Sequence, residues 1–382
     1  MIAGTIESTD DGRQTHFLRV FDGFLIAREQ TMTDTTSETP RRRRLARIDD
    51  VARLSGVSAA TVDRVLNQRP GVRAVTVQRV IKAAHELGYL MEGTLPAQAL
   101  KPWRLGFLLP AGTNRFLNML GRLIISSQDQ LASFNMRARV EHIESLKPDL
   151  LAQELLRLGR EVDGIVFMAI EHPAVREAVD VLAERGMPTV TLISDIANTR
   201  RIAYVGLDNR SAGRTAGYLI ARFIRNLPAQ VAMIAGSLSY RAHEEREMGF
   251  LHLFREQFPD IEVVGLREGH DDEAHNYRQT KLLLAKHPRL SGIYNIGGGA
   301  DGIGRALREA GRQRDVVFVG HGLSPDTRAM LLDGTMDAVL TQNPQTSLMD
   351  CISIFSSLRA GRAVQEATVR ARTELILCEN LP

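Results

Sequence analysis

The stretch DVARLSGVSAATVDRVLNQRPGV, residues 50–72, contains two short helical patterns on either side of a tight turn. Gly56 suits that turn, and Ser58 stands where it can cap the second helix. A third amphipathic pattern follows and ends at Gly88. The apolar positions that define the first two helix faces are Val51, Ala52, Leu54, Val62, Val65 and Leu66. Two helices joined by a short turn and backed by a third predict a small all-α helix-turn-helix domain over residues 46–90.

Positive charge gathers around this domain. Between residues 41 and 90 there are ten Arg and one Lys against three Asp and one Glu, which gives a net charge of +7. The whole chain carries only +3, so the remaining residues carry −4. Basic side chains collected in one small unit indicate a polyanionic partner such as DNA, and a solvated basic surface is the alternative.

The segments on either side of the domain carry little pattern. Residues 1–45, with a run of arginines at 41–44, are interpreted as a disordered extension or as an over-long start, in which case Met32 is the first residue. No secretory leader is expected there, because the apolar part lacks a basic start and a small-residue cleavage site. Residues 91–102 are expected to be a linker.

From Trp103 onward, ten apolar strand-like runs alternate with amphipathic helical patterns, beginning with WRLGFLLP and ending with MDAVLTQN. Continuous apolar strands separated by helices predict parallel sheets covered on both faces. Ten strands exceed one ordinary sheet, so we expect two α/β lobes within residues 103–382. The expected bounds are about 103–207 plus 343–367 for lobe one, and about 208–342 plus 368–382 for lobe two.

The composition argues against several other classes of protein. No apolar run approaches the length of a membrane span, so no membrane partner is expected. Cys351 and Cys378 give neither a disulfide framework nor a metal-binding spacing. We expect two buried, reduced thiols in a cytoplasmic protein without metal or cofactor.

The motifs of the helical domain resemble those of one bacterial family. The chain has Asp50-Val51-Ala52, Gly56-Val57-Ser58, Thr61-Val62-Asp63-Arg64-Val65-Leu66-Asn67 and Leu87-Gly88-Tyr89. This series is similar to the opening of the lactose-repressor family of transcriptional regulators, and the α/β order extends the resemblance over residues 46–382. The resemblance implies a two-lobed domain of the periplasmic-binding-protein type (type I). It also implies a homodimer that binds double-stranded operator DNA, represses carbohydrate uptake or catabolism genes, and responds to a sugar-like effector between the lobes.

The second helix carries the candidate DNA-reading side chains. Arg64 can donate two hydrogen bonds to guanine, whereas Ala59 and Ala60 offer methyl contacts to thymine. Asp63 stands where relatives have a small or neutral residue, and it can accept from cytosine or form an ion pair with Arg64. Phosphate contacts are expected from Ser55, Ser58, Thr61 and Asn67.

The segment after the helical domain departs from the family. Relatives carry a hinge helix with the pattern Asn-x-x-Ala-Arg-x-Leu, whose leucine enters the minor groove. The corresponding MEGTLPAQALKPW lacks that pattern and is interrupted by Pro96, with Leu100 as the only substitute. Whether a hinge helix forms in residues 91–102 therefore stays open.

Candidate effector-binding residues follow the predicted strands, because ligands of α/β proteins lie at the carboxyl ends of parallel strands. By the resemblance, Arg246 and Gln342 match ligand-binding positions of relatives, and Asn114 with Phe116 resembles an Asn-Pro-Phe-Phe loop. The full set is Asn114, Phe116, Glu171, Asp195, Arg241, His243, Arg246, Asn295, His321 and Gln342. Together these side chains favour a small polyhydroxylated effector.

Two neighbouring sets of residues are interpreted differently. Asp208 and Asn209, at a crossing between the lobes, are expected to be structural. Relatives have Asn-Asp where this chain has Gly298-Gly299, so the resemblance does not identify a particular sugar.

A dinucleotide-binding enzyme is the first alternative, because Gly297-Gly298-Gly299-Ala300-Asp301-Gly302 fits G-x-G-x-x-G. Such a site needs an acidic residue at the end of the next strand, and that strand ends in His321. A stand-alone sugar-binding protein is the second alternative, and the helix-turn-helix domain argues against it. We therefore expect a regulator and not an enzyme.

Overall fold

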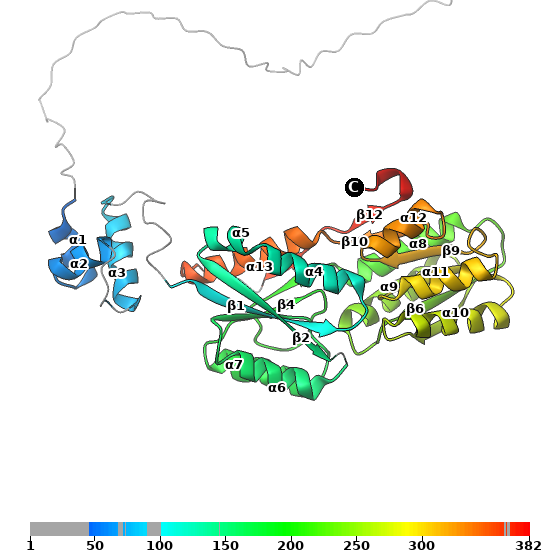
Figure 1. The fold of residues 1–382 in the computed structure, drawn as a ribbon, viewed down its shortest axis with the longest axis horizontal. Coiled ribbons are helices and arrows are strands. Elements are labelled where there is room, and N and C mark those ends of the chain that lie inside the picture. Colours follow the sequence, from blue (N-terminus) through cyan, green and yellow to red (C-terminus); the bar gives the residue numbers. More distant parts are fainter. Residues whose placement is uncertain are drawn as a thin grey trace, which may run out of the picture.

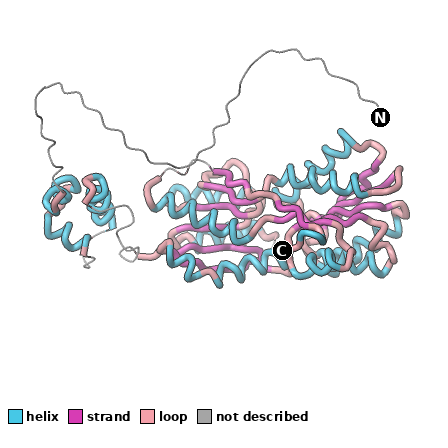
Figure 2. The backbone as a smooth tube through the Cα atoms, turned by 90° about the horizontal axis from the view of Figure 1, so that it is seen from above, coloured by secondary structure: helices cyan, strands magenta, loops and turns pink. Residues whose placement is uncertain are grey.

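A computed structural model describes residues 46–67, 72, 74–89, 101–144, 146–362, 364 and 367–382. The expectations for residues 1–45 and for a hinge helix in 91–100 fall outside these ranges. Figure 1 shows three helices followed by two α/β lobes, and Figure 2 shows the strands of both lobes from above.

The helical domain is built as the sequence predicts. It consists of α1 (Ile48–Ser55), α2 (Ala59–Leu66) and α3 (Ala74–Glu86). Gly56 ends α1 with a φ of 66°, and Ser58 Oγ accepts a hydrogen bond from the backbone N–H of Thr61 at 3.2 Å. The buried core is Val51, Val62, Val65, Val80, Ala83 and Ala84. The predicted helix-turn-helix is thus confirmed.

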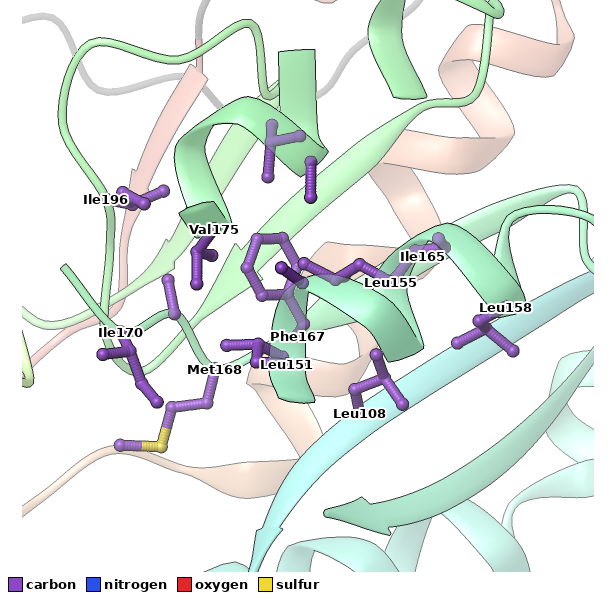
Figure 3. Close-up of a cluster of buried hydrophobic side chains, with 14 of the residues drawn as sticks. Leu108, Leu151, Leu155, Leu158, Ile165, Phe167, Met168, Ile170, Val175 and Ile196 are labelled. Atoms are coloured by element: carbon purple, nitrogen blue, oxygen red, sulfur yellow. The ribbon is translucent and has the colours of Figure 1, made fainter. Parts of the chain in front are cut away.

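Lobe one contains a six-stranded parallel sheet in the order β11-β5-β4-β3-β1-β2. The strands are β1 (Trp103–Ala111), β2 (Met136–Glu144), β3 (Gly164–Phe167), β4 (Thr189–Leu192), β5 (Ala203–Gly206) and β11 (Ala367–Arg370). The helices are α4 (Arg115–Ser126), α5 (Gln128–Ser133), α6 (Pro148–Leu158), α7 (Pro173–Glu184) and α13 (Pro344–Arg359). Helices α6 and α7 lie on one face and α4, α5 and α13 on the other (Figure 1). Figure 3 shows the core beneath α6 and α7, where Leu155, Phe167 and Val175 pack together.

Lobe two contains a second six-stranded sheet in the order β12-β10-β9-β8-β6-β7, parallel except for β12. The strands are β6 (Ala229–Ala235), β7 (Ile261–Glu268), β8 (Leu290–Asn295), β9 (Val317–His321), β10 (Ala338–Thr341) and β12 (Glu374–Ile376). The helices are α8 (Asn209–Phe223), α9 (Arg241–Gln257), α10 (Glu273–Lys286), α11 (Ala300–Glu309), α12 (Pro325–Leu332) and the 3-10 helix η2 (Cys378–Asn380). Helices α8 and α9 cover one face, and α10, α11 and α12 the other.

Helices α8 and α9 cross at glycines. A Cβ on Gly213 would lie 2.0 Å from the carbonyl oxygen of Arg246, and one on Gly249 would lie 2.1 Å from that of Arg210. At each of these glycines the backbones of the two helices are in direct contact. This close contact fixes the position of the Arg246 backbone in lobe two.

The chain crosses between the lobes after β5, after β10 and after β11. The last crossing comes after Arg370, three residues later than expected, because β11 pairs with β5 and completes the edge of the first sheet. The expectation of two buried thiols was wrong for Cys378, which is exposed on η2, whereas Cys351 is buried. Among the described residues no helix is long and apolar enough to span a bilayer.

Candidate DNA-reading helix and ligand cleft

Helix α2 has one buried face and one exposed face. Val62 and Val65 point into the helical core, whereas Ala59, Ala60 and Arg64 are exposed. Two small side chains beside an exposed guanidinium let a helix approach base edges closely, with one fork able to bind guanine.

The flanking polar residues hold the ends of α2. Ser58 caps its start, with its Oγ 2.9 Å from the hydroxyl of Thr61. At the other end Asn67 Nδ2 donates to Asp63 Oδ1 at 2.7 Å, one turn away. Ser55 differs from these residues, because it is buried and its hydroxyl donates to the Val51 carbonyl at 2.6 Å within α1. Its hydroxyl is therefore engaged inside the helical domain.

A cavity lies between the two lobes, at the carboxyl ends of the strands. Six of the predicted effector residues line it: Asn114, Phe116, His243, Arg246, His321 and Gln342. It encloses about 70 Å³, which holds a few water molecules. Known small-molecule pockets are about 300–1,000 Å³, so this part of the cleft by itself is small for a sugar-sized ligand. A second cavity of about 220 Å³ shares Asn114 and Asp271 with the first.

The orientation of the Asn114 amide is set by α4. Its Oδ1 caps the helix by accepting from the backbone N–H of Leu117 at 3.2 Å. Because the oxygen is used at the helix, the nitrogen faces lobe two and donates to Asp271 Oδ2 at 2.9 Å. Asn114 is therefore a hydrogen-bond donor in the cleft.

Arg246 brings a positive charge into the closed cleft. It is 6% exposed, and its Nε and Nη1 donate at 2.8 Å to Asn209 Oδ1 and to the Ile296 carbonyl. Both acceptors are neutral, and burial lowers the pKa of the guanidinium. Arg246 lines the cavity with donors that these two bonds leave unused.

The two histidines of the cleft are neutral hydrogen-bonding groups. Burial lowers the pKa of His243 to about 4 from its ordinary 6.5, and its Nδ1 lies 2.9 Å from the Ser237 carbonyl oxygen. Burial, and then the charge of Arg246, lower the pKa of His321 well below 6.5. His321 Nε2 lies 2.7 Å from the hydroxyl of the buried Tyr294.

Gln342 sits at the second crossing between the lobes. It follows β10 of lobe two, is 5% exposed, and donates from Nε2 to Ser347 Oγ on α13 of lobe one at 3.2 Å. A ligand that forms a hydrogen bond with this amide would therefore contact the segment that connects the two lobes.

Four predicted effector residues lie outside the cavity lining, and three of them are in ion pairs. Glu171 accepts from Arg176 Nη2 at 2.5 Å, and Asp195 accepts from two nitrogens of Arg201 at 2.5 Å each. Arg241 donates to Glu245 on its own helix at 2.7 Å.

The fourth residue outside the lining, Asn295, is buried behind the cleft. It donates from Nδ2 to the Gly298 carbonyl at 3.1 Å, so it supports the glycine turn. Asp208 and Asn209 begin α8, with Asp208 accepting from Ser211 N at 3.0 Å.

Several residues of the cleft were missed in the sequence. They are Arg115, Asp271, Ser324, Asp326 and Thr327. Arg115 of lobe one donates to Asp301 of lobe two at 2.7 Å and lies 3.7 Å from Asp326, so it joins the lobes. The turn that carries Asp271 follows a predicted strand, β7, and the rule of strand ends pointed to it.

A helix-turn-helix domain joined to two α/β lobes that enclose a cleft defines a DNA-binding protein with a ligand sensor. Residues 47–91 match the family described as bacterial regulatory proteins, lacI family, and residues 138–361 match the periplasmic binding protein domain. The chain therefore belongs to the lacI family and is a ligand-responsive, DNA-binding transcriptional regulator.

Individual relatives agree with this assignment. Catabolite control protein A of Priestia megaterium is 29% identical over 65% of this chain and 72% of its own length. The regulator MalR of Clostridium butyricum is 28% identical over 65% of this chain and 73% of its own. Among solved structures, the glucose-galactose binding protein GanP of Geobacillus stearothermophilus has a TM-score of 0.67 at 23% identity, covering 74% of this chain and all (100%) of that chain. A solute binding protein of Burkholderia graminis in complex with D-arabinose has a TM-score of 0.67 at 21% identity, over 74% and 97%.

Proposed function

We propose that this protein is a homodimeric, cytoplasmic repressor of carbohydrate uptake or catabolism genes, released from or bound to its operator by a sugar-like effector. The observation that carries the proposal is the presence, in one chain, of an exposed reading helix and of a cleft lined by convergent hydrogen-bonding groups. The names of the similar proteins, a glucose-galactose binding protein and an arabinose complex, support a sugar.

The cleft has the chemistry that a sugar ring requires. Asn114 and Arg246 offer donors from opposite lobes, and Gln342 offers both a donor and an acceptor. Phe116 supplies an apolar surface against which a ring can stack. Because the closed cavity is small, the effector enters when the lobes separate, and its affinity for one lobe arrangement over the other sets the change in operator affinity.

The reading unit is proposed to contact DNA through α2. Arg64 reads a guanine, Ala59 and Ala60 face thymine methyl groups, and Ser58, Thr61 and Asn67 bind phosphates. Asp63 positions Asn67 beside them. One such unit reads half of a near-palindromic site, so the partner is a second copy of the chain, with residues 103–382 as the dimerisation unit.

We propose a regulator without enzymatic activity, in line with its relatives. The glycines of the G-x-G-x-x-G segment have packing roles: a Cβ on Gly297 would lie 2.4 Å from Asp271, and one on Gly302 would lie 2.0 Å from the Glu273 carbonyl oxygen. A turn filled by the protein's own atoms has no room for a pyrophosphate.

Selection of binding sites from genomic fragments by the full chain tests the proposal. The expected result is a near-palindromic sequence bound by a dimer, with affinity changed by one member of a panel of sugars and sugar acids. Equal binding to random DNA at moderate salt would contradict it.

A further inference from the structure

The turn between β7 and α10 aims one carboxylate into the cleft. Gly269 and His270 donate from their backbone N–H groups to Ala235 at 2.7 Å and Gly236 at 2.9 Å, which fixes the turn to the end of β6. His270 and Asp271 then adopt left-handed φ values of 54° and 55°. Two successive non-glycine residues in this region are rare, and they persist where the surroundings over-determine the backbone.

The Asp271 side chain bridges the lobes. Its Oδ2 accepts from Asn114 Nδ2 of lobe one at 2.9 Å, and its Oδ1 accepts from the backbone N–H of Gly298 in lobe two at 2.6 Å. Its own carbonyl accepts from Thr113 Oγ1 of lobe one at 2.8 Å. One residue of lobe two therefore holds the loop of lobe one that carries Asn114 and Phe116.

Three of the residues that surround this carboxylate are glycines. A Cβ on Gly236 would approach Asp271 Oδ1 to 2.3 Å, one on Gly297 to 2.4 Å, and one on Gly298 would approach Asn114 Nδ2 to 2.8 Å. A side chain at any of these three positions would push the carboxylate or its partner out of place. These three glycines leave a space that fits the Asp271 carboxylate, which we call the glycine seat.

The groups in this seat are donors that a bound effector would use. Asn114 presents an N–H because its oxygen caps α4, Gly298 presents a backbone N–H, and the charge of Arg246 lies in the same cavity. A pair of oxygens carrying negative charge satisfies the Asn114 and Gly298 donors, and Asp271 supplies that pair from within the chain, with the charge of Arg246 acting on it from the same cavity.

We propose that Asp271 is a tethered stand-in for the effector: its carboxylate closes the lobes without a ligand, and the effector is a small molecule with a carboxylate that displaces it. The proposal rests on the proposed function only in calling that molecule the effector. The self-closure is a property of the chain alone and is measured without DNA.

The experiment follows lobe closure in the full chain by energy transfer between two dyes. One dye is on the exposed native Cys378 of lobe two and the other on Gln153→Cys of α6 in lobe one, while Cys351 is buried. In this background Asp271→Gly removes the carboxylate yet keeps a residue that accepts a left-handed φ, and Asp271→Asn removes one acceptor of the pair. Glu273→Gln, two residues away, half-buried and paired with Arg305 instead of with lobe one, is the matched control for loss of charge.

The expected result is high transfer in the parent and in Glu273→Gln, and lower transfer in both Asp271 variants, with unchanged circular dichroism. Acetate, which equals the missing side chain, restores high transfer in Asp271→Gly at millimolar concentration, whereas equal chloride does not. Acetate binds the parent at least tenfold more weakly, because the seat is filled.

Equal transfer in the parent and both variants would show that Asp271 does not hold the lobes closed. Open variants that acetate leaves open would overturn the stand-in role. Operator binding is measured separately by gel shift. If Asp271 closes the lobes as described but the protein shows no operator preference, the proposed function alone is refuted.

Discussion

Arg246 and Asn209 form a buried hydrogen bond of 2.8 Å that ties the cleft to the first crossing between the lobes. Asn209 Nδ2 donates in turn to the Tyr204 hydroxyl at 3.1 Å. That hydroxyl lies 3.0 Å from the Ile193 carbonyl and 3.1 Å from that of Leu207, next to the crossing. The position of Arg246 is therefore linked to the backbone at the first crossing between the lobes.

Asn209→Ala is expected to lower the free energy of unfolding of the lobes by about 1–3 kcal/mol, because it leaves a charged, buried donor without its acceptor. Urea denaturation checks this value, with the exposed Asn226→Ala as control. A variant as stable as the parent would show that the bond contributes nothing.

The buried histidines predict acid sensitivity. Because the folded pKa values of His243 and His321 lie below the ordinary 6.5, the unfolded chain takes up protons first as the pH falls. Their contribution to stability is complete above pH 6.5 and is lost as the pH falls below 6.5, down to about 4 for His243, by at most about 1.4 kcal/mol per pH unit for each proton. Denaturation at a series of pH values measures the slope. His321→Gln, which keeps a partner for Tyr294, is expected to reduce the slope by one proton, and an unchanged slope would contradict the assignment.

Arg64 and the arginines at 41–44 are expected to act differently on DNA. Arg64→Ala is expected to cost about 1–3 kcal/mol on the selected site and to relax specificity at one base pair of each half-site. Replacing two arginines at 41–44 by Ala is expected to weaken binding to all sequences and to lower the salt slope. Competition gel shifts separate the two effects. If Arg64→Ala weakened specific and random DNA equally, Arg64 would be a phosphate contact.

Gln342→Ala is expected to weaken effector binding by about 1–3 kcal/mol, the loss of a buried polar partner, while operator affinity without effector changes little. Isothermal titration with the sugar that shifts operator binding gives the number. Gln345→Ala, three residues further along and bonded to Gln130 within lobe one, is the matched control. Parent-like titration of Gln342→Ala would place the effector elsewhere.

Strand-like runs were enough to predict ten of the twelve strands of the two sheets, because the inner strands, which are covered on both faces, are buried almost throughout. The two missed strands, β11 and β12, have only 4 and 3 residues and lie at sheet edges. Such strands are set by their neighbours, and the local sequence carries little signal. The other two edge strands, β2 and β7, were predicted because they are longer, with 9 and 8 residues.

The sequence located the edge of the sheets where the cleft lies but not the direction of each side chain. Glu171 and Asp195 follow strands of lobe one, yet nearby arginines draw their carboxylates into ion pairs. Asp271 was missed because comparison with family positions directed attention to other loops. The rule of strand ends pointed to its turn, but the direction of its side chain depends on a left-handed backbone and on glycines more than 25 residues away, which no local pattern reveals.

The glycine crossing of α8 and α9 bears on any attempt to retune the protein as a biosensor. Gly213→Ala would press a methyl group against the Arg246 carbonyl and, by forcing the helices apart, is expected to cost about 1–3 kcal/mol, measurable as a fall in melting temperature. In a mutant library that includes this position, the members with a side chain there would lose stability whatever ligand they bound. Variation at Phe116, which lines the cavity, spares the crossing and changes a wall of the cleft, whereas Ser324 and Thr327 also line the cavity but cap α12. Ligand specificity can therefore be varied at the cavity wall, whereas the glycines at the crossing of α8 and α9 have to be kept.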